Sequence, residues 1–335
     1  MTPSAVRPPT PLGWAAERWT LGPRALRWGT TAALVASILI VLGGVVVRVT
    51  GSGLGCPTWP TCTEGSLIST PELGIHGAIE FGNRLVTGLL VATVGWAIVA
   101  ARLQRPRDRM LTRLAWSMFW LVIANAIAGG ITVWVKLNPW VVALHFVLAM
   151  GLLACATFTW HRARWSGGEG ARPSATARAL AWGLAIVAGA LVITGTLVTG
   201  SGPHAGDSQD VPRMGFDWST VVVVHGSAAL AVLVLAVALA FRLRTEEGGS
   251  LALRRVGFFL LVLLGQMTLG VTQSLIGIPE LLVALHGVLA AMVWVGALRV
   301  LLDTDPRLWA VRDHQLVAPG TESGAPAQPL DRSAL

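Results

Sequence analysis

The segment His76-Gly77-Ala78-Ile79-Glu80-Phe81-Gly82-Asn83-Arg84 places charged and polar side chains at the start of a long apolar run. His76, Glu80, Asn83 and Arg84 follow the spacing i, i+4, i+7 and i+8, which puts them on one face of a helix. Ionisable groups are costly inside a bilayer, so this face must point into the protein interior. The segment therefore predicts a membrane helix with a functional polar face.

The composition indicates a membrane protein. The chain has 335 residues, of which 53% are hydrophobic and only 13% charged, a balance too apolar for a soluble domain. Eight apolar runs approach the ~20 residues that a helix needs to cross a bilayer. We predict an all-α membrane protein with eight transmembrane helices, a cytoplasmic linker at 161–178, and disordered ends at 1–27 and 303–335. The predicted spans are 28–49, 76–101, 114–135, 140–160, 179–199, 220–241, 256–277 and 281–302.

The basic residues predict how the chain is oriented. Of the 25 lysine and arginine residues, 21 lie in the two ends and in the alternate connections 102–113, 161–178 and 242–255. An excess of positive charge marks the cytoplasmic side of a membrane protein. We therefore expect a multi-pass protein of the plasma membrane with both termini in the cytoplasm. The net charge of +8 comes from the arginines that orient the chain in the lipid bilayer. It does not indicate nucleic-acid binding.

Internal matches indicate a tandem duplication. Short motifs of the first half recur in the same order in the second half, at offsets of 140 to 149 residues. We therefore expect two four-helix bundles, at 28–160 and 179–302. The matching pairs are 50–53 with 199–202, 76–77 with 225–226, 130–132 with 270–272, and 142–145 with 283–286.

Four histidines accompany this duplication. His76, His145, His225 and His286 fall on the second, fourth, sixth and eighth predicted spans, all of which run from outside to inside. We expect them at one depth, as the pairs His76 with His145 and His225 with His286. Two facing imidazoles inside a helix bundle are typical of axial ligands to haem iron. A zinc site is disfavoured, because no carboxylate or thiolate recurs with the histidines.

Two further features are not repeated in the second half. Cys56 and Cys62 lie in a loop on the non-cytoplasmic side, where a disulfide is plausible as a structural staple or as a redox pair. Glu80 has Ala229 as its counterpart, so we expect the first half to react and the second to hold a permanent haem. The alternative is that Glu80 and Arg84 form a buried i,i+4 ion pair that only neutralises itself.

Segments 43–62, 79–84 and 129–145 together resemble the haem A synthase family, and the resemblance extends over about 28–302. It implies eight spans in two halves, oxidation of the ring-D methyl of haem O to the formyl group of haem A for haem-copper oxidases, and a haem b in the C-terminal half. It also implies haem O as the substrate of the N-terminal half and a prenyltransferase, haem O synthase, as a neighbour.

The resemblance assigns roles to individual residues. His145, His225 and His286 match haem ligands, Glu80 matches an essential glutamate, and Cys56 and Cys62 match a loop disulfide. Within the family motif Glu-x-x-His, however, the ligand position holds Asn83.

We favour His76 as the replacement ligand, with Asn83 and Arg84 beside the haem. The alternative is a five-coordinate iron on His145, with an open position for oxygen chemistry. Glu80 would relay protons or position the substrate.

The sequence thus predicts a membrane oxidoreductase that hydroxylates haem O twice, after which the diol loses water. Two rival functions stay open: a diheme b-type electron carrier, and a non-catalytic haem carrier or oxidase assembly factor. The electron donor is not identified by the sequence, and self-association into a homo-oligomer stays open.

Overall fold

The computed structural model describes residues 10–165, 173–204, 206–207, 211–246 and 249–310. Within these residues the chain is helical, and eight helices are long and apolar enough to cross a membrane. The prediction of an all-α membrane protein with eight spans is confirmed. The long helices are α2 (Pro23–Val49), α3 (Gly74–Arg102), α4 (Arg109–Trp134), α5 (Pro139–Arg162), α6 (Ala175–Ser201), α7 (Trp218–Arg244), α8 (Ser250–Leu275) and α9 (Glu280–Thr304). The short ones are α1 (Pro11–Arg18), η1 (Pro71–Leu73) and α10 (Arg307–Ala310).

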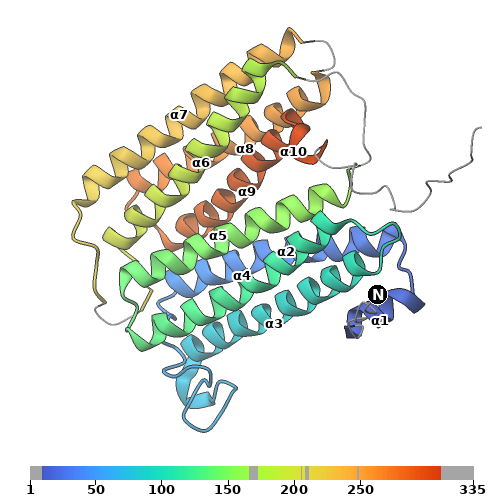
Figure 1. Cartoon of the computed structure of the whole chain (residues 1–335). Helices are drawn as coiled ribbons and strands as arrows, with labels where there is room; N and C mark the ends of the chain where they lie inside the picture. Colours follow the sequence, from blue (N-terminus) through green and yellow to red (C-terminus); the bar gives the residue numbers. More distant parts are fainter. Residues whose placement is uncertain (1–9, 166–172, 205, 208–210, 247–248, 311–335) are drawn as a thin grey trace, which may run out of the picture.

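The long helices form two groups of four, α2 to α5 and α6 to α9 (Figure 1). Each group has its own core: Met118 is fully buried in the first, and Phe259 is 1% exposed in the second. A smaller cluster that includes Val41, Met150 and Ala291 joins the two groups. The Trp294 Nε1–H donates to the Met150 carbonyl across this junction at 3.0 Å. The arrangement suits a duplicated unit, and the duplication itself stays a prediction.

Polar caps begin several of the long helices. The Asp108 carboxylate accepts from the Leu111 N–H at the start of α4, and the Asn138 side chain accepts from the Trp140 N–H at the start of α5. Such caps satisfy backbone donors that have no partner inside the helix. The turn between α4 and α5 is short, and Lys136 and Leu137 there have φ of 51° and 57°. It brings the end of α4 directly beside the start of α5.

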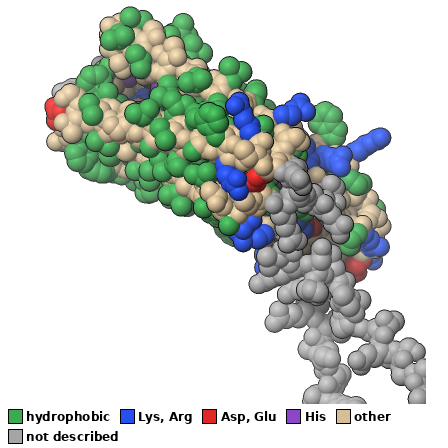
Figure 2. Space-filling view, turned by 90° about the horizontal axis from the view of Figure 1, so that it is seen from above, with side chains coloured by type: hydrophobic (Ala, Val, Ile, Leu, Met, Phe, Trp, Pro, Cys, Tyr) green, Lys and Arg blue, Asp and Glu red, His purple; other side chains and the backbone are tan. Residues whose placement is uncertain are grey.

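The two ends of the bundle differ in character. One end carries the long connections 50–73 and 202–217, and we call it the long-loop end. The other carries the connections in which the arginines concentrate, and we call it the basic end. Figure 2 shows hydrophobic side chains along much of the body and Lys and Arg side chains gathered toward one end. An apolar belt of this kind is the surface that a bilayer requires.

The structure corrects the disorder predicted for 1–27. Residues 11–18 form α1, and α2 begins at Pro23. The guanidinium of Arg105 donates to the carbonyls of Ala16 at 2.7 Å and Glu17 at 2.9 Å, which holds the end of α1 against the turn between α3 and α4. Part of the predicted linker, 166–172, and most of the predicted C-terminal tail, 311–335, lie outside the described residues, as do 1–9.

Candidate functional site

Two histidines face each other in the second group of helices, near the long-loop end. His225 lies two turns into α7 and His286 two turns into α9. Their ring centroids are 6.4 Å apart with an interplanar angle of 63°. Nδ1 of His225 lies 3.2 Å from the Thr194 hydroxyl on α6. A hydrogen bond at this nitrogen orients the ring and leaves the other nitrogen free for a ligand.

Asp217 fixes the start of the helix that carries His225. Its carboxylate accepts hydrogen bonds from the hydroxyls of Ser219 and Thr220 and from the Thr220 N–H, at 2.6 to 2.8 Å. Because these bonds favour the ionised form, they hold the pKa of Asp217 below its usual value. The cap is therefore complete at neutral pH and is lost only as the pH falls through this lowered pKa.

Each of these rings packs against a glycine of the preceding helix. A Cβ added at Gly195 of α6 would lie 3.3 Å from Cε1 of His225, and one at Gly270 of α8 would lie 3.0 Å from Cε1 of His286. These distances are close to the limit of ordinary carbon contacts. Glycine therefore lets the helices approach closely enough for the imidazoles to lie against the neighbouring backbone.

The first group of helices repeats this packing with one change. His145 of α5 packs against Gly129 of α4, where an added Cβ would lie 3.2 Å from the ring. On α3, the side chain that packs against a glycine of the preceding helix is Asn83, whose Oδ1 occupies the space beside Gly43 of α2. Asn83 thus stands where the second group has His225.

His76 lies elsewhere. It is in the first turn of α3, and its Nδ1 is 3.0 Å from the hydroxyl of Ser52, a fully buried residue of the preceding loop. Seven residues separate it from Asn83, or about 10 Å at ~1.5 Å per residue. The prediction that the four histidines share one depth was wrong for His76. Its role as an iron ligand stays a prediction.

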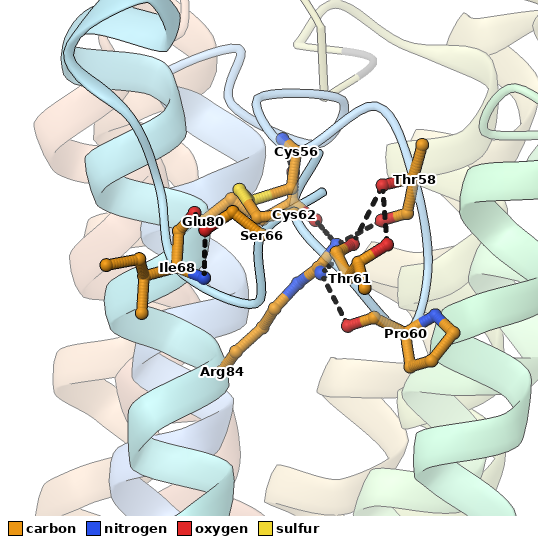
Figure 3. Close-up of a disulfide and its surroundings, with 9 residues drawn as sticks. All are labelled: Cys56, Thr58, Pro60, Thr61, Cys62, Ser66, Ile68, Glu80 and Arg84. Atoms are coloured by element: carbon orange, nitrogen blue, oxygen red, sulfur yellow. Dashed lines mark hydrogen bonds and ion pairs between the residues drawn. A yellow bond between two sulfur atoms is a disulfide. The ribbon is translucent and has the colours of Figure 1, made fainter. Parts of the chain in front are cut away.

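Glu80 and Arg84 bind the disulfide loop (Figure 3). Glu80 is 7% exposed, and its Oε1 accepts from the guanidinium of Arg84 at 2.6 Å. Its Oε2 accepts from the backbone N–H of Cys56, also at 2.6 Å. Arg84 in turn donates to three carbonyls of the loop, those of Thr58, Pro60 and Thr61.

Cys56 and Cys62 form the expected disulfide, and both are fully buried. The polar face of α3 therefore clamps the disulfide loop onto the helix. The alternative of an isolated ion pair between Glu80 and Arg84 does not describe the site, because both side chains also bind the loop backbone.

Trp59, within the disulfide loop, inserts against α4. A Cβ added at Gly130 would lie 2.5 Å from its ring, and the ring meets Trp134 edge to face at a centroid distance of 5.6 Å. Gly130 is next to Gly129, on which His145 packs. The loop thus covers α4 one residue from the glycine on which His145 packs.

We expect Gly130→Ala to loosen this cover. The added methyl group displaces the Trp59 ring, and overpacking of this kind costs ~1–3 kcal/mol. Reduction of the buried disulfide in the folded protein should then accelerate about tenfold, because local opening exposes it more often. The measurement is thiol alkylation during a timed treatment with a phosphine reductant. Gly151→Ala is the matched control, since only Leu121 comes within 4.0 Å of its added Cβ. Equal rates in the two variants would contradict the packing argument.

The two long connections also contact each other. Ser52 forms an isolated antiparallel bridge with Asp207, and the Gly53 N–H donates to the Gly206 carbonyl at 2.7 Å. Below them, the guanidinium of Arg48 on α2 donates to the Thr199 carbonyl on α6 at 2.6 Å. The first and second groups of helices are therefore joined at the level of the loops as well as in the core.

Several of these contacts could not be predicted from the sequence. Ser52 and Trp59 lie in motifs of the repeat or of the family resemblance, but their contact partners, His76 and Gly130, are distant in the chain. The spacing of the glycines was a weaker indication: Gly129 precedes His145 by the same 16 residues by which Gly270 precedes His286. His161, on α5, is another residue that was not singled out. It is buried, and its Nδ1 lies 3.7 Å from Asp303 of α9, so it belongs to the packing of the basic end.

The residues at His225 and His286 fit a haem iron. Two imidazoles on one metal, each bonded at ~2 Å, place their ring centroids roughly 6 Å apart, close to the observed 6.4 Å. In the part of the chain that the structure describes, no group of three or more His, Cys, Asp and Glu residues could hold a bare metal ion. The arrangement suits a cofactor that takes only two ligands from the protein.

Comparison with known proteins identifies relatives of this chain. Three similar proteins are each called heme A synthase. That of Lysinibacillus sphaericus (strain C3-41) is 37% identical over 131 residues, that of Staphylococcus haemolyticus (strain JCSC1435) 32% over 128, and that of Geobacillus kaustophilus (strain HTA426) 31% over 137. Each match covers 38% of this chain and 40 to 41% of the relative. The chain thus spans about two fifths of the length of the curated relatives that it matches.

A family comparison reaches further along the chain. The sequence pattern of the COX15-CtaA family, described as cytochrome oxidase assembly protein, matches residues 68–298. This range is more than half of the chain, and it contains all four side chains that pack on the glycines. The chain therefore belongs to the COX15-CtaA family of cytochrome oxidase assembly proteins.

Proposed function

We propose that this chain is a haem A synthase, which converts the ring-D methyl group of haem O to a formyl group by successive hydroxylation, for use in haem-copper oxidases. The observation that carries the proposal is the facing pair His225 and His286 at 6.4 Å, in a chain of this family. The name of the relatives supports the same activity.

The two halves take different roles in this proposal. His225 and His286 hold a resident haem b, which supplies electron transfer when it is bound. His145 and Asn83 flank the site of the haem O substrate in the first half. The clamp of Glu80 and Arg84 on the disulfide loop supports this division, because it covers the first half alone.

Glu80 is the residue that transfers protons in this proposal. Oxidising a methyl to a formyl group with water as the oxygen source releases four protons and four electrons, and the electrons must pass to an electron acceptor outside the chain. A buried carboxylate near the site can accept or relay such protons. Its two hydrogen bonds, to the Cys56 N–H and to Arg84, hold it in one orientation at the loop. Glu80 would thus both position the loop and move protons.

The proposed setting is the plasma membrane, with both termini in the cytoplasm and the long-loop end outside. The concentration of arginines at the basic end supports this orientation. A fluorescent protein fused after residue 335 should therefore fluoresce in the cytoplasm, whereas a periplasmic or extracellular reporter such as alkaline phosphatase should be inactive there. The opposite result would reverse the topology. Haem O synthase is the proposed neighbour that supplies the substrate.

The test of the function is haem extraction from membranes. The full chain is co-expressed with a haem O-producing prenyltransferase in a host that lacks its own haem A pathway, and the non-covalent haems are separated by chromatography. Haem A, with or without a hydroxylated intermediate, is the expected result. Haem B and unconverted haem O alone, in folded protein with a supplied reductant, would instead support an electron carrier or a non-catalytic haem carrier.

A further inference from the structure

We infer that the first half offers a haem iron a single imidazole, from His145, and that the carboxamide of Asn83 faces the iron from the other side. The sixth coordination position is then open to a small exogenous ligand such as carbon monoxide or dioxygen. The inference deepens the proposed function and rests on it in one respect, that a haem is the occupant of this site.

The same packing occurs in the helix pairs α2–α3, α4–α5, α6–α7 and α8–α9. In each pair one side chain of the second helix packs on a glycine of the first, and that glycine lies five or six residues before the end of its helix. Three of these side chains are histidines and the fourth is an asparagine. The pairs are Gly43 with Asn83, Gly129 with His145, Gly195 with His225, and Gly270 with His286.

The Asn83 side chain carries an unsatisfied hydrogen-bond acceptor. Its Oδ1 is buried and has no hydrogen-bond partner. Leaving a buried acceptor unsatisfied is destabilising, so a side chain held in this state points to a ligand that the site is built to receive. An amide oxygen is nevertheless a poor ligand for haem iron, which prefers imidazole. Asn83 therefore faces the iron without saturating it.

His76, the competing ligand, is the one histidine on α3. It lies about 10 Å further toward the long-loop end than Asn83, at ~1.5 Å of rise per residue. Its Nδ1 is already within 3.0 Å of the buried Ser52 hydroxyl. Its turn of α3 also packs against Gly55 of the loop, where an added Cβ would overlap the His76 carbonyl. His76 is thus part of the loop cover.

This difference gives the two halves opposite properties. Two imidazoles at His225 and His286 fill both axial positions of an iron and leave no room for a small ligand. One imidazole at His145 leaves a position on the Asn83 side. The asymmetry places ligand binding in the half that also carries Glu80 and the disulfide loop.

The experiment uses spectroscopy of the full chain in lipid nanodiscs, loaded with haem and assayed for haem content. In the reduced wild type we expect one carbon monoxide bound per chain, and in the oxidised form a high-spin signal beside a low-spin one. Asn83→His should abolish carbon monoxide binding and convert the high-spin signal to low-spin. His225→Asn, the mirror variant, should create a second carbon monoxide site in the other half.

Further variants make the result decisive. His145→Ala should remove the ligand-binding haem, and His76→Ala should leave the spectra unchanged. The inference is overturned if the wild type binds no carbon monoxide while His76→Ala does, if Asn83→His leaves binding unchanged, or if the first half retains no haem. These readouts do not depend on turnover. If the spectra are as expected and the chain still forms no haem A, this inference stands and the proposed function is wrong.

Discussion

Glu80→Gln is expected to lower haem A formation about 100-fold while both haems stay bound, a loss at the low end of the 10²–10⁴ contributed by general acid–base groups. Glutamine keeps the shape of the side chain and can still accept from the Cys56 N–H. It cannot take up a proton, and it removes the negative charge that faces Arg84 at 2.6 Å. The measurement is the ratio of haem A to haem O extracted from membranes. Glu72→Gln is the matched control, because Glu72 is an exposed carboxylate in the same connection.

A second measurement separates proton transfer from positioning by Glu80. Arg84→Gln removes the contacts of Arg84 with the loop carbonyls and leaves the carboxylate in place. If Glu80 only holds the loop, both variants should lose activity to the same extent and expose the disulfide to reductant equally. If Glu80 transfers protons, Glu80→Gln should lose activity with the disulfide still protected. Normal haem A output from Glu80→Gln would exclude proton transfer by Glu80.

His286→Ala is expected to remove one haem from the chain. In the proposed function His286 is one of two axial ligands of the haem b, so its loss would break an axial bond and leave a cavity beside Gly270. Haem content should fall from two to about one per chain, and the low-spin signal should disappear. Since a bound cofactor stabilises the fold that binds it, the midpoint of thermal unfolding should fall as well.

The control for this variant is His204→Ala. His204 lies in the second long connection, and its Nε2 is 2.9 Å from the Ile278 carbonyl, away from the paired rings. The His204→Ala variant should retain both haems. An unchanged low-spin signal in His286→Ala would show that His225 and His286 do not share an iron, and it would remove the observation on which the proposed function rests.

Part of the site could be predicted from sequence, because its determinants are local. Helical spacing grouped Glu80 and Arg84 on one face of α3, and a four-residue separation is enough to bring them together. His225 and His286 were paired correctly, since each follows the start of its helix by a similar number of residues. The disulfide between Cys56 and Cys62 was likewise predicted, because both lie in one loop on the non-cytoplasmic side.

Other parts could not be predicted, because they depend on how helices pack. Counting offsets along the chain matched His76 with His225, since each stands in a His-Gly dipeptide. In the fold, however, α3 begins at Gly74 and the partner of Gly43 is Asn83. A shift of seven residues is two helical turns, which keeps the same face but changes the depth by about 10 Å at ~1.5 Å per residue.

The neighbouring glycines show the same limit. Offset counting matched Gly130 with Gly270, whereas in the fold Gly129 is the one that supports a histidine, and Gly130 accommodates Trp59. Adjacent positions on a helix point about 100° apart, so a register error of one residue exchanges one partner for another.

The sequence by itself thus determined the eight spans, the basic end, the family and most of the residue types at the site. These follow from hydropathy, charge and short-range spacing, which each residue carries wherever the chain folds. Only the tertiary structure decided which side chains lie at the same depth along the helix bundle. It set Asn83 against Gly43, placed His76 in the loop cover, and turned Glu80 and Arg84 into a clamp on the disulfide loop. The reason is that close packing against glycine fixes the depth of each helix, and that contact joins residues up to 40 positions apart.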